Sequence, residues 1–214
     1  MAYVLGFVVA DGCVIKRKNR KHSYFLNITN KEKKHLENIG MTLGWQGGLG
    51  AKHGGYTSKK NYYYIQSCSR EICEDLIALG VKPHKTHSLE PIKVPRNYFS
   101  DFVRGFFDGD DSVYIYIVNG TPRIKASFYN PKFSFSTDLN QRICQYLGIF
   151  PKTIHQQMKK GANIPLYYIN FYIDDCEKFH DFMYSHNPSL YLPRKRKIFE
   201  KWKLMINDIA LINL

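Results

Sequence analysis

Three aspartates stand close together in "VRGFFDGDDSV", residues 103–113, of a chain whose formal net charge is +13. Asp108, Asp110 and Asp111 follow an apolar run. Clustered carboxylates repel one another and cost free energy unless a cation lies among them. Mg²⁺ prefers carboxylates together with water and phosphate oxygens. The stretch therefore predicts a divalent-metal site.

An earlier stretch of the chain repeats this pattern. "VLGFVVADGCV", residues 4–14, aligns with residues 103–113 at a constant offset of 99 residues, position 110 against position 11. In each copy two small residues lie four apart, which places them on one face of a helix. A glycine inside a helix costs up to ~1 kcal/mol relative to alanine, so close packing of the two helices is the expected compensation. The shared positions are Val4 and Val103, Gly6 and Gly105, Phe7 and Phe106, Asp11 and Asp110, and Val14 and Val113.

Parallel packing of these two helices would bring Asp11 and Asp110 together at the helix C-termini, where unpaired carbonyls add partial negative charge. Such a group of oxygens suits Mg²⁺, and two-metal chemistry at this place would hydrolyse a phosphodiester bond. The plain alternative is a pair of helix-terminal acids that bind nothing.

The segments after each copy are also alike. "YFLNITNKEKKHLENIGMTLGW" (24–45) and "FSFSTDLNQRICQYLGI" (133–149) are both predicted to run from a strand into an amphipathic helix. "NYYYIQS" (61–67) and "LYYINFYI" (166–173) are predicted aromatic strands. We therefore predict an α+β fold of two pseudo-symmetric αββαββα halves, 1–91 and 99–214, with a linker at 92–98. Ser100 is the predicted N-cap of a helix that ends near Gly109.

Composition points to a polyanionic partner. The chain has 31 Lys and Arg against 18 Asp and Glu, and a pI near 9.4. Nucleic acid is the leading candidate, and charge that only keeps the protein soluble is the alternative. The five cysteines form no C-x-x-C pair, so neither a disulfide framework nor a zinc site is indicated. No segment reads as a signal peptide or a membrane span, and we expect an intracellular protein.

The two repeated stretches resemble the paired signature of the LAGLIDADG homing endonucleases, in the arrangement where one chain carries both copies. "VLGFVVADG" is a close match, and "VRGFFDGDD" matches except at its last position. The resemblance implies a saddle of two antiparallel sheets along double-stranded DNA, with the motif helices packed at the central interface. It also implies a monomer that cuts both strands of a long asymmetric site with Mg²⁺ and leaves short 3′ overhangs. Mn²⁺ or Ca²⁺ is expected to substitute for binding.

The resemblance also assigns residues. Asp11 and Asp110 match the metal-binding acids, and the carbonyls of Ala10 and Gly109 lie where the family's helix ends approach metal. Asn30 and Lys31 match a catalytic polar residue and lysine, although Asn30 is equally explained as a helix N-cap and Lys31 as an ordinary helix lysine. The corresponding place in the second half is Ser136-Thr137-Asp138, with Lys125 or Lys132 as alternatives for the missing lysine. Asp108 is expected to be structural.

Asp111 departs from the family, which almost always has glycine there. Glycine after a helix end commonly has positive φ, which aspartate adopts only at a cost. Three interpretations stay open: a natural variant, a further metal contact, or a substitution that attenuates cleavage and leaves DNA binding.

DNA contacts are predicted from loops and strands. The basic loops would contact phosphates rather than only water, and alternate strand residues would read bases. The predicted phosphate contacts are Lys16, Arg17, Lys18, Arg20, Lys21, Lys59, Lys60, Lys159 and Lys160. The predicted base contacts are Asn27, Thr29, Tyr64, Gln66, Arg123, Lys125, Ser134 and Asn170.

The function predicted from these features is intron homing by a free-standing nuclease, acting on DNA in a bacterial or phage-host cytoplasm or in an organelle. Two alternatives on the same scaffold are a maturase that binds RNA and a regulator that binds DNA without cutting it. Acids at both Asp11 and Asp110 favour the nuclease, because a pure binder gains nothing from carboxylates facing a polyanion.

Overall fold

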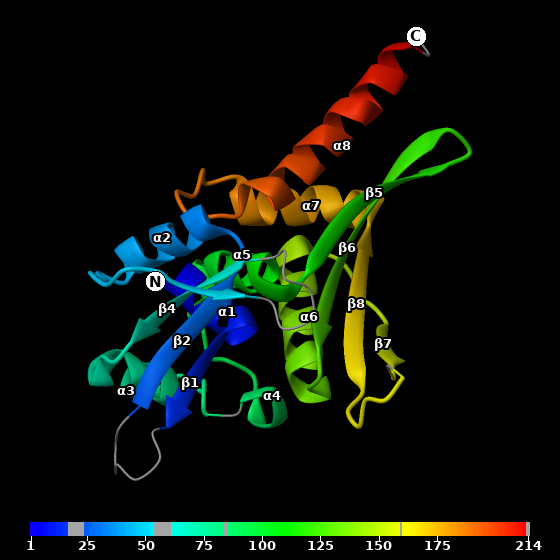
Figure 1. Ribbon diagram of the computed structural model, residues 1–214. Helices are drawn as coiled ribbons and strands as arrows, with labels where there is room; N and C mark the ends of the chain where they lie inside the picture. Colours follow the sequence, from blue (N-terminus) through cyan, green and yellow to red (C-terminus); the bar gives the residue numbers. More distant parts are fainter. Residues whose placement is uncertain (17–23, 54–60, 84, 159, 213–214) are drawn as a thin grey trace. The chain divides into compact units, whose positions relative to one another are not determined.

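The computed structural model describes residues 1–16, 24–53, 61–83, 85–158 and 160–212. The chain divides into two compact units, residues 1–109 and 110–214. Each unit contains one four-stranded antiparallel sheet with helices packed on it (Figure 1). The predicted α+β class with two similar halves is confirmed. No helix in the described ranges combines the length and apolar character needed to cross a bilayer.

The first unit follows the predicted order of elements. The helix of the first motif, α1, is followed by two strands, a helix, two strands and further helices. Their bounds are α1 Ala2–Asp11, β1 Gly12–Lys16, β2 Tyr24–Asn30, α2 Lys33–Thr42, β3 Gly50–His53, β4 Asn61–Ser67, α3 Arg70–Ala78, α4 Lys85–Ser88, a 3₁₀ turn Arg96–Tyr98 and α5 Phe99–Asp110.

The second unit repeats this order after the end of α5. Its last helix is much longer than α4, its counterpart in the first unit. The bounds are β5 Ser112–Val118, β6 Thr121–Asn130, α6 Phe133–Leu147, β7 Ile154–Gln157, β8 Leu166–Tyr172, α7 Ile173–Tyr184 and α8 Pro193–Ile212.

The two sheets share one topology. Their strand orders are β1-β2-β4-β3 and β5-β6-β8-β7. Side chains alternate between a buried face under the helices and an open face, as the two-residue period of a strand requires. In β2, Leu26 and Ile28 are fully buried, whereas Asn27 and Thr29 between them are half-buried. In β6, Ile124 and the residues at every second position after it are likewise buried.

Helices α1 and α5 touch through their backbones, as the repeated glycines predict. A Cβ atom on Gly6 would lie 2.0 Å from the carbonyl oxygen of Phe102. A Cβ atom on Gly105 would lie 1.9 Å from the carbonyl oxygen of Tyr3. Neither position has room for a side chain, so the two glycines set how closely the helices approach. Because α5 packs on α1, the first compact unit includes it up to Gly109.

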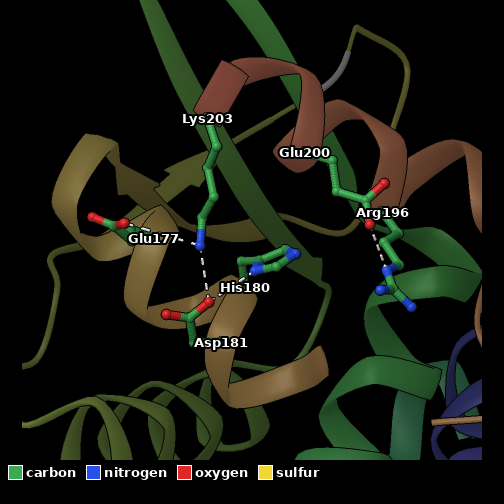
Figure 2. Close-up of polar contacts among 6 residues, drawn as sticks. All are labelled: Glu177, His180, Asp181, Arg196, Glu200 and Lys203. Atoms are coloured by element: carbon green, nitrogen blue, oxygen red, sulfur yellow. Dashed lines mark hydrogen bonds and ion pairs between the residues drawn. The ribbon is translucent and has the colours of Figure 1, made fainter. Parts of the chain in front are cut away.

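Aromatic packing and ion pairs hold α8 against α7. The Phe199 ring lies 6.2 Å from that of Phe179. Lys203 Nζ lies 2.9 Å from Asp181 Oδ1, which His180 Nδ1 also approaches at 2.9 Å (Figure 2). Burial alone would raise the pKa of Asp181, but hydrogen bonds from His180 and Lys203 bring it below its ordinary value. The stabilisation from this carboxylate is therefore present above the ordinary aspartate range and is lost as the pH falls through the lowered pKa.

Two predictions about the second half are wrong. Residues 133–149 do not begin with a strand, because α6 already starts at Phe133 and the strand, β6, precedes it. Phe135, Leu139 and Ile143 are buried at intervals of four, which is a helical period. The motif helix also starts at Phe99 rather than after Ser100, since a 3₁₀ turn leads into it.

We expect Gly105→Ala to destabilise the protein although alanine is the better helix former. The added methyl would meet the carbonyl oxygen of Tyr3, and overpacking typically costs about 1–3 kcal/mol, more than the ~1 kcal/mol gained in helix propensity. Urea denaturation followed by circular dichroism measures the difference. Gly48→Ala is the control, because a Cβ there has nothing within 4 Å. A Gly105→Ala protein as stable as the parent would disprove the backbone contact.

Candidate functional site

Asp11, the last residue of α1, is held by the end of strand β2. Asn30 Nδ2 donates a hydrogen bond to Asp11 Oδ2 at 2.7 Å. The amide oxygen of Asn30 accepts from the backbone N–H of Glu32 at 2.9 Å, which orients the amide group. Asn30 thus supports the start of α2 and positions the half-buried Asp11 at once.

A lysine ammonium lies at the same helix end. Lys85, the first residue of α4, donates from Nζ to the carbonyl oxygens of Val9 and Ala10, with a distance of 2.9 Å to the latter. These carbonyls belong to the last turn of α1, where a helix carries partial negative charge. The oxygens of this helix end therefore already attract a cation.

The second unit places a lysine just after its own motif acid. Asp110, the last residue of α5, is exposed. Lys195, near the start of α8, is 2% exposed and donates from Nζ to the backbone oxygen of Asp111 at 2.6 Å. Both units thus bring one lysine to the chain directly beside the motif aspartate.

Sequence reasoning missed this pair of lysines. Lys85 follows Pro83 by two residues in "VKPHK", and Lys195 follows Pro193 by two residues in "LPRK". The shared Pro-x-Lys pattern was the available signal. Proline favours the first positions of a helix, so the same spacing places each lysine in a first helical turn. Neither Lys125 nor Lys132, the alternatives predicted for the second half, occupies this place; Lys125 lies on the open face of β6.

Asp111 does not have the strained backbone that its position predicts. It is not among the described non-glycine residues with positive φ, and its counterpart Gly12 is extended at φ −94. Asp111 is 5% exposed, and its Oδ1 accepts the backbone N–H of Tyr129 at 2.8 Å. The carboxylate therefore adds one hydrogen bond to β6 just before Ser112, the first residue of β5. The expectation of a conformational cost at Asp111 is wrong.

Asp108 and His35 both lie at the hydroxyl group of Tyr3. Asp108 is fully buried, and its Oδ2 accepts from the Tyr3 hydroxyl at 2.7 Å, which fits the expected structural role. His35 Nε2 lies 2.9 Å from the same hydroxyl. Lys31 is exposed, and its catalytic role stays a prediction.

The base contacts predicted for the first half share the open face of the first sheet. Asn27 pairs with Gln66, and Thr29 pairs with Tyr64, across β2 and β4. Lys52 joins them from β3, with Nζ 3.4 Å from Thr29 Oγ1 and 4.9 Å from the centre of the Tyr64 ring. These polar groups form one continuous surface on the open face.

The second half places most of its predicted contacts in the same way. Arg123, Lys125 and Asn170 lie on the open face of the second sheet, but Ser134 does not, because it belongs to helix α6. Of the predicted phosphate contacts, Lys16 and Lys160 are exposed. The others lie outside the described residues: Arg17, Lys18, Arg20, Lys21, Lys59, Lys60 and Lys159.

The donor set at the end of α1 fits a hard cation rather than zinc. Within the described ranges, no three His, Cys, Asp or Glu side chains gather in a way that could hold a metal ion. What the first unit offers is one carboxylate and adjacent backbone carbonyls that already bind an ammonium group. Oxygen atoms of this kind are ligands for Mg²⁺, with water completing the shell.

No protein-family model matches the sequence, and no curated protein is significantly similar to it. Solved structures do match. A double mutant of I-SmaMI has a TM-score of 0.62 at 12% identity, covering 99% of this chain and 92% of that chain. The LAGLIDADG homing endonuclease I-LtrWI bound to target DNA has a TM-score of 0.60 at 13% identity, with 98% and 90% covered. I-DmoI in complex with DNA and Mn has a TM-score of 0.53 at 15% identity, with 86% and 96% covered. At such identities the likeness establishes a shared fold.

We expect Asp111→Gly to destabilise the protein. Glycine would leave the Tyr129 N–H without its carboxylate acceptor, and a buried unsatisfied donor costs about 1–3 kcal/mol. Asp111→Asn is the matched control, because it keeps an oxygen acceptor and should lose less. Urea denaturation of both variants measures the difference. A glycine variant as stable as the parent, or more stable, would restore the interpretation of a strained aspartate.

Proposed function

We propose that this chain, which has the fold of the LAGLIDADG homing endonucleases, is a site-specific DNA endonuclease. The observation that carries the proposal is the group at the end of α1. Asn30 holds the carboxylate of Asp11, and the ammonium of Lys85 lies at the carbonyl of Ala10 beside it. A binding protein has no need of an oriented acid next to a lysine, whereas phosphodiester hydrolysis uses both.

The metal ligands that we propose are Asp11 and Asp110 with the carbonyls of Ala10 and Gly109. Mg²⁺ held there would supply Lewis-acid activation of water and would stabilise the leaving oxygen. The chain itself supplies orientation, because the Asn30 amide fixes Asp11 and so restricts where a water beside that carboxylate can lie. Lys31, exposed next to Asn30, is a proposed contact to the DNA backbone.

Lys85 and Lys195 are the proposed electrostatic catalysts. Each is anchored to backbone oxygen directly beside a motif aspartate, so each brings a fixed positive charge to the place where phosphate negative charge would increase. A charge that is positioned in advance stabilises a transition state without reorganisation. Lys195 supplies the second-half lysine that the segment Ser136-Thr137-Asp138 lacks.

The proposed substrate is double-stranded DNA with a long, asymmetric target. The net charge of +13 favours a polyanion, and the open face of each sheet carries side chains that can hydrogen-bond base edges. Because the two open faces differ in sequence, one chain would read two different half-sites, and no second copy is required. We also propose that cleavage leaves short 3′ overhangs and that its biological role is intron homing.

We expect Asp11→Asn and Asp110→Asn each to abolish Mg²⁺-dependent cleavage and keep DNA binding. Asparagine at position 11 keeps an oxygen that can accept from Asn30, so the fold is retained while the charge is lost. Metal assistance is worth several kcal/mol, so cleavage should fall by about 10³-fold or more. The target is first selected from a randomised duplex library, and binding is then measured in Ca²⁺. Cleavage that survives both substitutions would remove the two aspartates from the proposed metal site. DNA binding without any cleavage by the parent would assign the chain to the DNA-binding regulators.

We expect Lys85→Met to lower the single-turnover cleavage rate by about 10²-fold or more while DNA affinity changes little, since removing one preorganised donor has effects of that size. Lys82→Met is the control, because Lys82 is exposed on the same segment three residues earlier. Equal rates for the two variants would remove Lys85 from the mechanism. A loss of affinity equal to the loss of rate would instead make it an ordinary DNA contact.

A further inference from the structure

The open faces of the two sheets can be compared row by row, because the strands pair in equivalent registers. The row of Cys13, Asn27 and Gln66 corresponds to that of Ser112, Ser127 and Asn170. In the first sheet this row presents two amides next to each other. In the second sheet Ser127 Oγ donates to Asn170 Oδ1 at 2.8 Å, and Asn170 is only 8% exposed. The second sheet therefore has no exposed amide pair in this row.

The rows on either side carry tyrosines in the second sheet. Tyr114, Lys125 and Tyr172 form one row across β5, β6 and β8. Both tyrosines are 44% exposed. Lys125 Nζ lies 5.7 Å from the centre of the Tyr172 ring, and Tyr114 is the cross-strand partner of Lys125. Burial would lower the pKa of Lys125, but Tyr114, Tyr172 and Tyr129 together raise it, so the lysine stays charged at neutral pH.

The opposite row is aromatic throughout. Tyr129 pairs with Tyr168, their ring centres 5.9 Å apart, and Tyr168 stacks on His155 at 5.0 Å. The first sheet has Thr29, Tyr64 and Gly50 at these positions, and the Tyr64 ring covers Gly50. On the other side of the face, in β5, the ring centre of Tyr116 lies 6.0 Å from that of Tyr114. The second open face thus carries tyrosines on both sides of the Ser127 row, with Lys125 between Tyr114 and Tyr172 and Arg123 opposite Tyr116.

We propose that thymine methyl groups, packed against the tyrosines of this second face, select the half-site that residues 110–214 bind. This inference rests on the proposed function and names the sequence class that one half of the target must have. Lys125 reads a guanine among these thymines. The amides of Asn27 and Gln66 read adenine in the other half-site.

The chemistry of the major groove supports this assignment. The C5 methyl of thymine is the only apolar group that base pairs present there, and apolar side chains contact it. Guanine presents two acceptors that suit a lysine, and adenine presents the donor and acceptor that match an amide. The neighbouring tyrosine rings of this face offer apolar area against which such a methyl group can pack. Burying one methyl corresponds to about fourfold in affinity.

The test replaces single thymines of the selected target by deoxyuridine, which removes the methyl and leaves every hydrogen-bonding group. We expect substitutions in one half-site to weaken binding by about fourfold each in gel-shift titrations. Tyr114→Ser and Tyr172→Ser should each abolish the loss of affinity caused by deoxyuridine at the thymine that the replaced ring contacts. Tyr114→Phe should keep that loss. Both tyrosines are half exposed, so the variants retain the fold, and Tyr98→Ser on the exposed 3₁₀ turn is the control.

Three outcomes would overturn the inference. Deoxyuridine without effect anywhere, or with the same effect in the serine variants as in the parent, would show that the rings do not contact methyl groups. Tighter binding of single-stranded RNA than of duplex DNA would assign the tyrosines to base stacking. Failure to select any duplex target would remove the proposed function as well, whereas selection of a target without thymine methyl dependence would remove this inference alone.

Discussion

The backbone contact between α1 and α5 is the constraint on which the rest of the first unit depends. Gly6 and Gly105 each lie where a Cβ atom would overlap a carbonyl oxygen of the other helix. Two interior glycines weaken both helices, so their presence requires a compensating gain from close packing. Helix α1 is buried along most of its length as a result. A helix held so firmly delivers Asp11 to a fixed place, where Asn30 can reach it.

Negative charge accumulates at the C-terminal end of each motif helix, and a lysine side chain offsets it in both units. A helix C-terminus carries unpaired carbonyls, and an aspartate at the same point adds a full negative charge. Lys85 binds these carbonyls in the first unit, and Lys195 binds the next carbonyl in the second. Each lysine lies in the first turn of a helix and follows a proline by two residues. Lys195 can be buried because α8 is anchored on α7 by Phe199 and Lys203. In both units the lysine itself offsets the negative charge at the helix end.

Sequence reasoning recovered what depends on local periodicity and on the internal repeat. It predicted both motif helices, the αββαββα order, the aromatic strands and the open-face position of Asn27 with Gln66. It failed where the local sequence pattern does not reveal the burial or the distant hydrogen-bond partner of a residue. "FSFS" alternates like a strand, yet burial of Phe135, Leu139 and Ile143 makes it the start of α6. The hydrogen bonds of Asp111 and Lys195 join residues far apart in the chain, and no local pattern reveals such partners.

The two halves of the chain show which positions the architecture dictates. Residues that pack at the helix contact or end a motif helix are the same in both copies: Gly6 and Gly105, Phe7 and Phe106, Asp11 and Asp110. Residues at equivalent positions on the open faces differ: Thr29 against Tyr129, and Gly50 against His155. Packing constrains the first set, because each side chain must fit its neighbours. The second set makes no such helix contact, so its positions can differ between the halves without loss of the fold.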